Sequence, residues 1–398
     1  MRSPLPRDQS NQLPEPRGDA LTHMHACMAM LRDEIAKSNG WISFARFMEL
    51  ALYAPGLGYY AAGARKFGAD GDFVTAPEIS SLFGQCLAQS IGEVVRETDG
   101  DVLELGPGSG KLAVDVLLEL EVVGSLPDKY FLLEVSADLR ERQQQAIASL
   151  PTHLANRAVW LDQLPQNFVG AVIANEVLDV VPVHLVTFSS RRVFERGVAV
   201  RDDALVRQDV PSLSPGLSEP VAAIQREYLD HAPPEGYLTE VAPAARGLVK
   251  SLAQSLKHGA MIFVDYGFRG AEYYHPSRIT GTLMCHYRHF AHTDPFRFPG
   301  LQDITAHVDF TAIADAGIAS GLELLGYTTQ ANFLLASGLT ERLQRADPAA
   351  AASYLPLTNQ VQRLVSPAEM GEFFKVIGFG KGLASPITAF AAARPLSL

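Results

Sequence analysis

Cysteine is scarce in this sequence: its 398 residues include Cys27, Cys86 and Cys285 alone, far apart and without a Cys-x-x-Cys pair. This spacing favours neither a disulfide framework nor a zinc clip, and it is typical of a protein from a reducing compartment. Long hydrophobic runs are lacking too, because no stretch approaches the roughly 20 apolar residues of a membrane-spanning helix. We therefore predict no membrane span and no metal site built on cysteine.

An excess of basic residues is also lacking, since 33 Lys and Arg face 44 Asp and Glu, giving a formal net charge of −11. Nucleic-acid binding needs clustered Lys and Arg against the phosphates, so we expect no nucleic-acid partner. The acidic balance suits a basic peptide or protein substrate instead. Residues 1–19 are rich in proline and mix arginine with acids, which predicts a disordered tail and not a signal or transit peptide. The lack of a transit peptide favours a cytoplasmic protein of a bacterial cell.

Apolar runs and helical periodicity alternate along the middle of the chain. Strands are expected at 101–105, 130–135, 157–160, 170–174 and 259–265, and helices near 110–121, 137–149 and 242–257. This alternation predicts an α/β protein with a mostly parallel sheet. The short runs between residues 184 and 208 predict an inserted antiparallel β-meander. A last strand is expected at residues 386–390.

The central motif is a glycine turn between a buried strand and a helix, at residues 101–110. Glu104 precedes Gly106, Gly108 and Gly110, so the spacing is Glu-x-Gly-x-Gly-x-Gly and not Gly-x-Gly-x-x-Gly. Pro107 removes an amide donor from the turn, and no Lys-Ser/Thr pair follows, so a phosphate cradle is not favoured.

A second acid stands where a nucleoside-binding fold needs one. Glu134 ends the next apolar run, 24 positions after Gly110, where a doubly wound fold presents a carboxylate to ribose hydroxyls. Together with Glu104 and the three glycines, it resembles the pattern of a class I S-adenosyl-L-methionine (SAM) methyltransferase. The alternative is a glycine-rich turn in some other α/β protein.

Four longer stretches make this resemblance more specific. They are Gly71–Ser80 with Phe83-Gly84, Asn175–His184, Val264–Gly267 and Asp303–Phe310. In this order around the glycine turn, they resemble the MidA-like family, which includes a mitochondrial protein arginine methyltransferase serving respiratory complex I assembly. The resemblance covers roughly residues 20–393. One departure is Met284-Cys285-His286, where the family pattern has small or basic residues, so a different target is expected if that loop touches substrate.

The resemblance implies a fold, a cofactor and a partner. The fold is a Rossmann-like class I methyltransferase core of seven strands, the last antiparallel, with helical additions at both ends. The cofactor is S-adenosyl-L-methionine, and the partner is a protein, either a respiratory complex I subunit or another arginine-containing protein. We expect a disordered tail at 1–19, a helical and loop region covering the cleft at 20–98, the core at 99–310 with an insertion at about 184–235, and a helical addition with the last core strand at 311–398.

The expected acceptor site lies after the fourth strand, because ligands of open α/β sheets bind at strand carboxyl ends. The amide oxygen of Asn175 can accept a hydrogen bond from an amine, and Glu176 and Asp179 can hold a guanidinium and receive its proton. Tyr266 is expected to contact the acceptor through its ring or hydroxyl. The alternative is that Asp179 caps a turn, Glu176 is a solvated loop acid and Tyr266 only packs.

The remaining site residues are assigned by their place beside strand ends or in the early loop. For the cofactor we expect Thr75, Glu78, Glu104, Gly106, Gly108, Gly110, Glu134, Asp162 and Asn175, with Asp162 near the adenine amine. For the substrate we expect Asp265, His307 and Asp309.

Two other functions remain open. The residues His286, His289 and His292, followed by Asp303, His307 and Asp309, allow a metal-dependent hydrolase. The spacing is not His-Glu-x-x-His, and hydrogen-bonded or solvated loop histidines are favoured. The other is a SAM-binding assembly factor that acts as a scaffold through its helical additions. No metal is expected.

Overall fold

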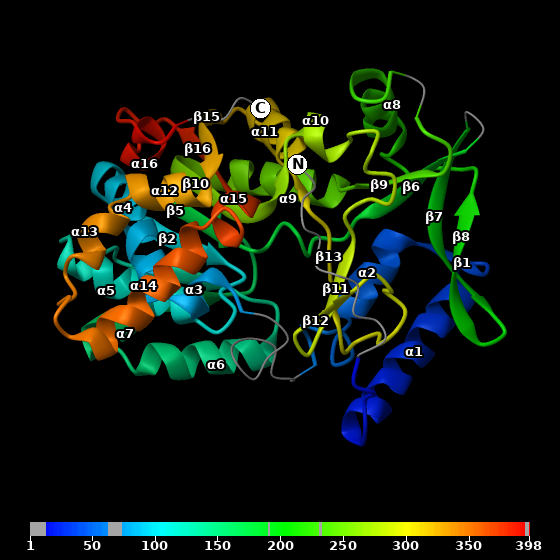
Figure 1. Ribbon diagram of the computed structural model, residues 1–398, viewed down its shortest axis with the longest axis horizontal. Helices are drawn as coiled ribbons and strands as arrows, with labels where there is room; N and C mark the ends of the chain where they lie inside the picture. The colour runs from blue at the N-terminus through cyan, green and yellow to red at the C-terminus, as the bar shows by residue number, and fades with distance from the viewer. Residues whose placement is uncertain (1–12, 63–73, 190–191, 231–232, 395–397) are drawn as a thin grey trace. The chain divides into compact units, whose positions relative to one another are not determined.

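The computed structural model describes residues 13–62, 74–189, 192–230, 233–394 and 398 (Figure 1). Residues 1–12 of the predicted tail and residues 71–73 of one predicted motif lie outside this part. The chain forms two compact units. Unit 1 contains Met1–Phe73, Asp179–Arg246 and Phe268–His307, and unit 2 contains Val74–Leu178, Gly247–Gly267 and Val308–Leu398.

Unit 2 is built on a mostly parallel sheet with the strand order β15-β16-β10-β5-β2-β3-β4, and β14 pairs with β10. The strands are β2 Asp101–Leu105, β3 Tyr130–Leu133, β4 Ala158–Leu161, β5 Phe168–Asn175, β10 Leu256–Phe268, β14 Val308–Asp309, β15 Glu323–Thr329 and β16 Phe374–Lys381. The strand β16 runs antiparallel to both β10 and β15, whereas β2, β3, β4, β5 and β10 pair in parallel. The predicted α/β core with an antiparallel last strand is confirmed.

The predicted position of the last strand was wrong. Residues 388–390 belong to a helix, α16 Thr388–Ala392, and β16 supplies the antiparallel strand. A Cβ at Gly378 of β16 would lie 2.3 Å from the ring of Phe390, so this ring occupies the space that the glycine leaves. The apolar residues near position 390 are therefore buried by packing across the sheet and not by pairing within it.

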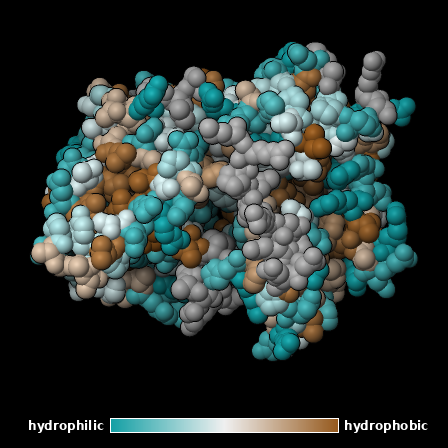
Figure 2. Space-filling view, viewed as in Figure 1, coloured by the Kyte–Doolittle hydropathy of each residue, from teal (hydrophilic) through white to brown (hydrophobic). Residues whose placement is uncertain are grey.

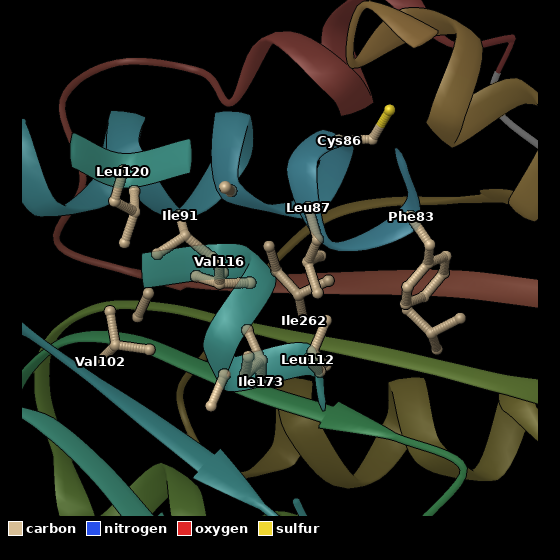
Figure 3. Packing of buried hydrophobic residues seen from close by; sticks show 14 of the residues in the cluster. Phe83, Cys86, Leu87, Ile91, Val102, Leu112, Val116, Leu120, Ile173 and Ile262 are labelled. Carbon is tan, nitrogen blue, oxygen red and sulfur yellow. The ribbon is translucent and has the colours of Figure 1, made fainter. Parts of the chain in front are cut away.

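Helices surround the sheet of unit 2. They are α3 Ala76–Ile79, α4 Ser81–Thr98, α5 Lys111–Val122, α6 Ala137–Ala148, α7 Thr152–Ala155, α11 Phe310–Ala319, α12 Gln330–Ala336, α13 Leu339–Leu343, α14 Ala351–Val365, α15 Met370–Phe373 and α16; the helix α9 Pro243–Ser255 begins in unit 1. The buried core lies where α4 and α5 meet the sheet (Figure 3). There Leu87 of α4 and Val116 of α5 pack with Ile173 of β5 and Ile262 of β10. Burial of each such side chain contributes about 1.5–3 kcal/mol.

Unit 1 contains the predicted meander. Its antiparallel sheet has the order β1-β7-β6-β9, with β8 paired to β7, and a second sheet has the order β12-β11-β13. The strands are β1 Trp41–Ser43, β6 His184–Ser189, β7 Arg192–Arg201, β8 Ala204–Val210, β9 Tyr237–Val241, β11 Met284–Tyr287, β12 Phe290–His292 and β13 Asp303–Thr305. The antiparallel pairing of β6 with β7 and of β7 with β8 confirms the meander.

The helices of unit 1 are α1 Asp19–Lys37, α2 Phe44–Tyr53, α8 Ser218–Glu227 and α10 Gly270–Tyr273. The helices α1 and α2, blue in Figure 1, pack against β1 and β7. The segment before α1 also packs within unit 1. Leu13 is buried with Tyr287 and Phe298, and Glu15 forms an ion pair with Arg297 at 2.8 Å.

The surface carries both polar and apolar side chains, and Figure 2 shows a hydrophobic patch on the left of this face. Leu335 of α12 and Leu355 of α14 are among the exposed large hydrophobic residues. Within the described ranges, no helix is both long enough and apolar enough to cross a membrane.

One carboxyl group lies inside the sheet of unit 2. Glu104 of β2 is 2% exposed and accepts a hydrogen bond from the Tyr130 hydroxyl at 2.7 Å. Burial raises the pKa of Glu104 to about 7, although the hydrogen bond from Tyr130 opposes this shift. The carboxyl therefore titrates near neutral pH.

Gly170 allows β5 to approach β2, and its replacement should weaken the sheet. Its φ is +130°, and a Cβ would lie 1.9 Å from the backbone oxygen of Asp101. We expect Gly170→Ala to lower the free energy of unfolding by about 3 kcal/mol, through backbone strain and overpacking together. The control is Gly124→Ala, where φ is +65° but no heavy atom lies within 4 Å, so only strain of about 1 kcal/mol applies. Equal losses in urea unfolding of the two variants would contradict this account.

The raised pKa of Glu104 predicts a pH dependence of stability. Between the ordinary value of 4.5 and about 7, the folded chain keeps a proton that the unfolded chain has released, so the free energy of unfolding falls as pH rises. The Glu104→Gln variant lacks this titration. Across that pH window, its free energy of unfolding should therefore fall by on the order of 2 to 3 kcal/mol less than that of the parent protein. Chemical unfolding at pH 4.5 and 7.5 measures the difference. The exposed-site variant Glu141→Gln should behave as the parent does, and a Glu104→Gln variant with the parent's pH dependence would refute the assignment.

Candidate active site

The glycine turn joins β2 to α5 in unit 2. Gly106, Gly108 and Gly110 have φ values of 59°, 55° and 83°, in the left-handed region that favours glycine. The Gly106 amide donates to the Leu133 oxygen at 3.1 Å, which ties the turn to the end of β3. A Cβ at Gly106 would lie 3.0 Å from the Val177 side chain, and Gly106 is otherwise exposed. The turn therefore offers bare backbone to a ligand at the edge of the sheet.

The predicted residues of the early loop lie at this turn. Thr75 is the residue before α3, and Glu78 is in the first turn of that helix. The Ser109 hydroxyl of the glycine turn donates to the Glu78 carboxylate. Glu78 thus borders the turn directly, and Thr75, half-buried, accepts the Glu78 amide through its backbone oxygen at 3.0 Å.

The predicted ribose acid, Glu134, is held by donors on both carboxylate oxygens. The Ser136 amide donates to Oε1 at 2.8 Å, and the Gln143 side-chain amide donates to Oε2 at 3.0 Å. The same Gln143 nitrogen donates to the Gly108 oxygen at 3.0 Å, and the Gln143 oxygen accepts from Trp160 Nε1 at 3.0 Å. These bonds join the glycine turn, β3 and β4 through one amide.

Sequence reasoning missed Gln143. The signal was present, because Leu139, Gln143 and Ile147 are the buried residues of α6 and recur every four positions. A glutamine in the apolar row of an otherwise polar helix indicates a buried hydrogen-bonding partner.

Asp162 lies after β4 with its side chain 88% exposed. Arg140 of α6 donates to Asp162 Oδ1 at 2.8 Å, to the Leu161 oxygen at 3.0 Å and to the Glu134 oxygen at 3.3 Å. Arg140 thus connects Asp162 to the strand ends that carry Glu134.

The carboxyl end of β5 carries the predicted acceptor residues Asn175 and Glu176. Glu176 has φ 53° and its amide donates to the Val264 oxygen of β10 at 2.9 Å. The Asn175 nitrogen donates to Glu176 Oε1 at 3.2 Å. The Asn175 side-chain oxygen is buried and accepts no hydrogen bond from any residue in the described part of the chain. This pair therefore presents a carboxylate and an amide oxygen side by side, both acceptors.

Asp265, predicted to touch substrate, is 1% exposed, and its carboxylate accepts hydrogen bonds from backbone amides of the turn after β5. Its Oδ2 accepts from the amides of Val177 at 3.2 Å and Leu178 at 2.9 Å, and its Oδ1 accepts from the Tyr266 amide at 2.9 Å. Since Val177 also faces Gly106, Asp265 holds the backbone that joins the acceptor turn to the glycine turn.

Two further predicted residues of unit 2 have structural contacts. The Tyr266 ring meets the Phe374 ring edge-on at 5.5 Å, as the packing alternative expects. Asp309 is the residue before α11, and its side chain accepts hydrogen bonds from the amides of Thr311 and Ala312 at 3.1 Å each, so it is the N-cap of this helix.

The other predicted residues, Asp179 and His307, belong to unit 1. Asp179 is 4% exposed, and its backbone oxygen accepts the Ala306 amide at 2.9 Å. His307 stacks on Phe268 at 5.1 Å with an angle of 10° between the rings, and the Arg278 guanidinium lies 4.3 Å from the Phe268 ring centre. Burial lowers the pKa of His307 to about 3, so the imidazole is neutral at physiological pH.

The histidine-rich stretch has no ligand set for a metal. Within the described ranges, no group of three His, Cys, Asp or Glu side chains could hold an ion. Burial lowers the pKa of His286 to about 4, and His292 is fully buried. The structure thus lends the metal-dependent hydrolase no support.

The sequence matches known methyltransferases over most of its length. Residues 82–328 match the family described as "Putative S-adenosyl-L-methionine-dependent methyltransferase". The chain is 31% identical over 376 residues to the mitochondrial protein arginine methyltransferase NDUFAF7 of Mus musculus, an alignment that covers 85% of this chain and 80% of the relative. The Homo sapiens protein of the same name is 30% identical over 377 residues, with the same coverage.

A solved structure resembles this chain over nearly its whole length. A Burkholderia thailandensis protein bound to S-adenosyl-homocysteine is 48% identical with a TM-score of 0.91, covering 96% of this chain and 98% of that chain. S-adenosyl-L-methionine is accordingly the cofactor, and the three glycines of the turn fit a ligand that approaches the backbone. The matched family, the mitochondrial relatives and this structure confirm the resemblance carried by the motifs, and the chain belongs to the MidA-like family of SAM-dependent methyltransferases.

Proposed function

We propose that this methyltransferase methylates an arginine side chain of a protein substrate. The observation that carries the proposal is the pair of acceptor groups at the end of β5, the Glu176 carboxylate and the Asn175 side-chain oxygen. The Asn175 oxygen is buried and accepts no hydrogen bond from a residue that the structure describes. A guanidinium offers only donors and stays charged, so it needs such acceptors. The names of the mitochondrial relatives, protein arginine methyltransferases, support the same substrate class.

The pair at β5 would orient the acceptor nitrogen. Bound SAM supplies a methyl group on a positively charged sulfur. Holding a nitrogen lone pair in line with that methyl is the main task of the protein. Glu176, whose backbone is fixed by β10 and whose turn is fixed by Asp265, would align the guanidinium and accept the proton released from nitrogen. Asp179, the next acid along the chain, is proposed as the second carboxylate for the guanidinium.

The cofactor would be held by the residues around the glycine turn. Glu134, whose two oxygens accept from the Ser136 amide and the Gln143 side chain, is proposed to accept from the two ribose hydroxyls as well. Asp162, on the exposed edge beside it, is proposed for the adenine amine. Gly106, Gly108 and Gly110 give access to the backbone, and Thr75, Glu78, Glu104 and Asn175 complete the proposed set.

The substrate protein is proposed to present arginine in a basic segment, which the net charge of −11 favours. A respiratory complex I subunit is one candidate. The cytoplasmic location remains a prediction from the sequence, and the relatives at about 30% identity are named as mitochondrial.

The test of function has two steps. Titration calorimetry should give about one SAM bound per chain. Incubation with methyl-labelled SAM and fractionated lysate should then yield methylarginine, identified by mass spectrometry in a protein band. Cofactor binding without any labelled acceptor across such fractions would favour the scaffold function instead.

Replacement of the first glycine of the turn should abolish cofactor binding. In Gly106→Val, a β-branched side chain would fill the exposed approach to the backbone and crowd Val177. We expect no detectable SAM binding by calorimetry. The control is Gly124→Val, which introduces similar backbone strain at a φ of +65°. A Cβ at Gly124 has no heavy atom within 4 Å, so this variant should bind SAM as the parent does. Normal affinity in a folded Gly106→Val variant would refute the placement of the cofactor.

Neutral replacements of the proposed acceptor acids should separate binding from turnover. Glu176→Gln and Asp179→Asn keep the shape of each side chain but remove its charge, so we expect SAM affinity to be retained. Methyl transfer should fall by about 100-fold or more, because a positioned proton acceptor contributes that much. The exposed-site variant Glu141→Gln is the control for both measurements. Unchanged turnover in either acid variant would remove that residue from the acceptor site.

A further inference from the structure

The side chain of Gln143 is fully buried in unit 2, and its amide bonds to the residues around the glycine turn. Its nitrogen donates to the Gly108 oxygen and to Glu134 Oε2, and its oxygen accepts from Trp160, each at 3.0 Å. No other uncharged side chain of this size supplies two donors and one acceptor at once. The one amide group therefore forms hydrogen bonds with the glycine turn, with Glu134 after β3 and with Trp160 of β4.

The backbone of α6 lies in close contact with the same turn. A Cβ at Gly110 would lie 3.1 Å from the Cα of Gln143, which is tighter than an ordinary van der Waals contact. Glycine at position 110 thus allows the helix to approach closely enough for the side-chain amide to reach Gly108. The short range of all these contacts leaves little freedom in the position of Glu134.

We propose that Gln143 is a positioning residue for SAM, which fixes the Glu134 carboxylate and the glycine turn in one arrangement before the cofactor binds. The proposal rests on the proposed role of Glu134 toward the ribose. A carboxylate fixed in advance loses less conformational entropy when the ligand binds, so affinity depends on the amide that fixes it. Gln143 itself acts through Glu134 and Gly108 and need not touch the cofactor.

The decisive variant is Gln143→Glu, which is nearly isosteric and makes the support for Glu134 depend on pH. In the parent protein the amide carries its two donors at every pH, so this support does not titrate. In the variant, an ionised carboxylate at this position faces the Glu134 carboxylate and the Gly108 oxygen without a donor, and like charges in a buried site repel. Protonation at lower pH restores one donor toward Glu134.

The experiment is calorimetric titration of SAM into the full chain at pH 5.5 and pH 8, for the parent, Gln143→Glu, Gln143→Leu and Gln144→Glu. Gln144 is the exposed neighbour on α6 and provides the matched control for an added charge. Relative to the parent at the same pH, Gln143→Glu should bind on the order of tenfold more weakly at pH 8 and recover most of this loss at pH 5.5. Gln143→Leu should be weakened equally at both pH values, and Gln144→Glu should match the parent.

Thermal unfolding without ligand shows which variants are folded, and the pH comparison within Gln143→Glu does not require the Leu variant to fold. Parent-like affinity of Gln143→Glu at both pH values, or an equal loss at both, would overturn the proposal. Because the readout is cofactor affinity, it stands apart from arginine methylation. A failure to find methylarginine would count against the proposed function and leave this measurement unaffected.

Discussion

The parallel register of β2, β5 and β10 is the constraint on which the candidate site depends. Leu105 lies opposite Ala174, and Asn175 lies opposite Val264, so β2 and β5 end at the same edge of the sheet, beside Val264 of β10. The close approach of these strands requires glycine, because a Cβ at Gly170 or Gly259 would lie 1.9 Å from a backbone oxygen of the neighbouring strand. This register brings the glycine turn and the Asn175-Glu176 turn to one place, and Asp265 joins them through Val177.

The sequence predicted the strands that have continuous apolar runs bounded by turns, and it predicted the meander from its alternating short runs. The failure at residues 386–390 has a physical cause. The strand β16 contains Gly378 and Gly380, which weaken a strand signal, whereas Phe390, which follows this strand, fills the space at Gly378. Periodicity alone does not distinguish a run buried by pairing from a run buried by packing.

The candidate site was predictable where a residue type has one obvious use, as with the glycines of the turn. It was less predictable for the acids, because a carboxylate can serve a ligand or a backbone amide equally well. Asp265 and Asp309 both accept hydrogen bonds from backbone amides, of a turn and of a helix start. Gln143 was missed because its helix is rich in Arg, Glu and Gln, so that its position in line with Leu139 and Ile147 was overlooked among solvated glutamines.

The division of the chain into two units has a consequence for how the protein can be handled. The backbone passes from one unit to the other five times, after residues 73, 178, 246, 267 and 307. Two of these passages come at the ends of β5 and β10, beside Glu176 and Tyr266. Removal of residues 1–73 leaves unit 2 whole but takes β1 from the sheet of unit 1. A protease cut at any of the five passages separates strands that pair in one sheet. The smallest piece of this chain that holds every strand of the three described sheets runs from β1 to β16, residues 41–381.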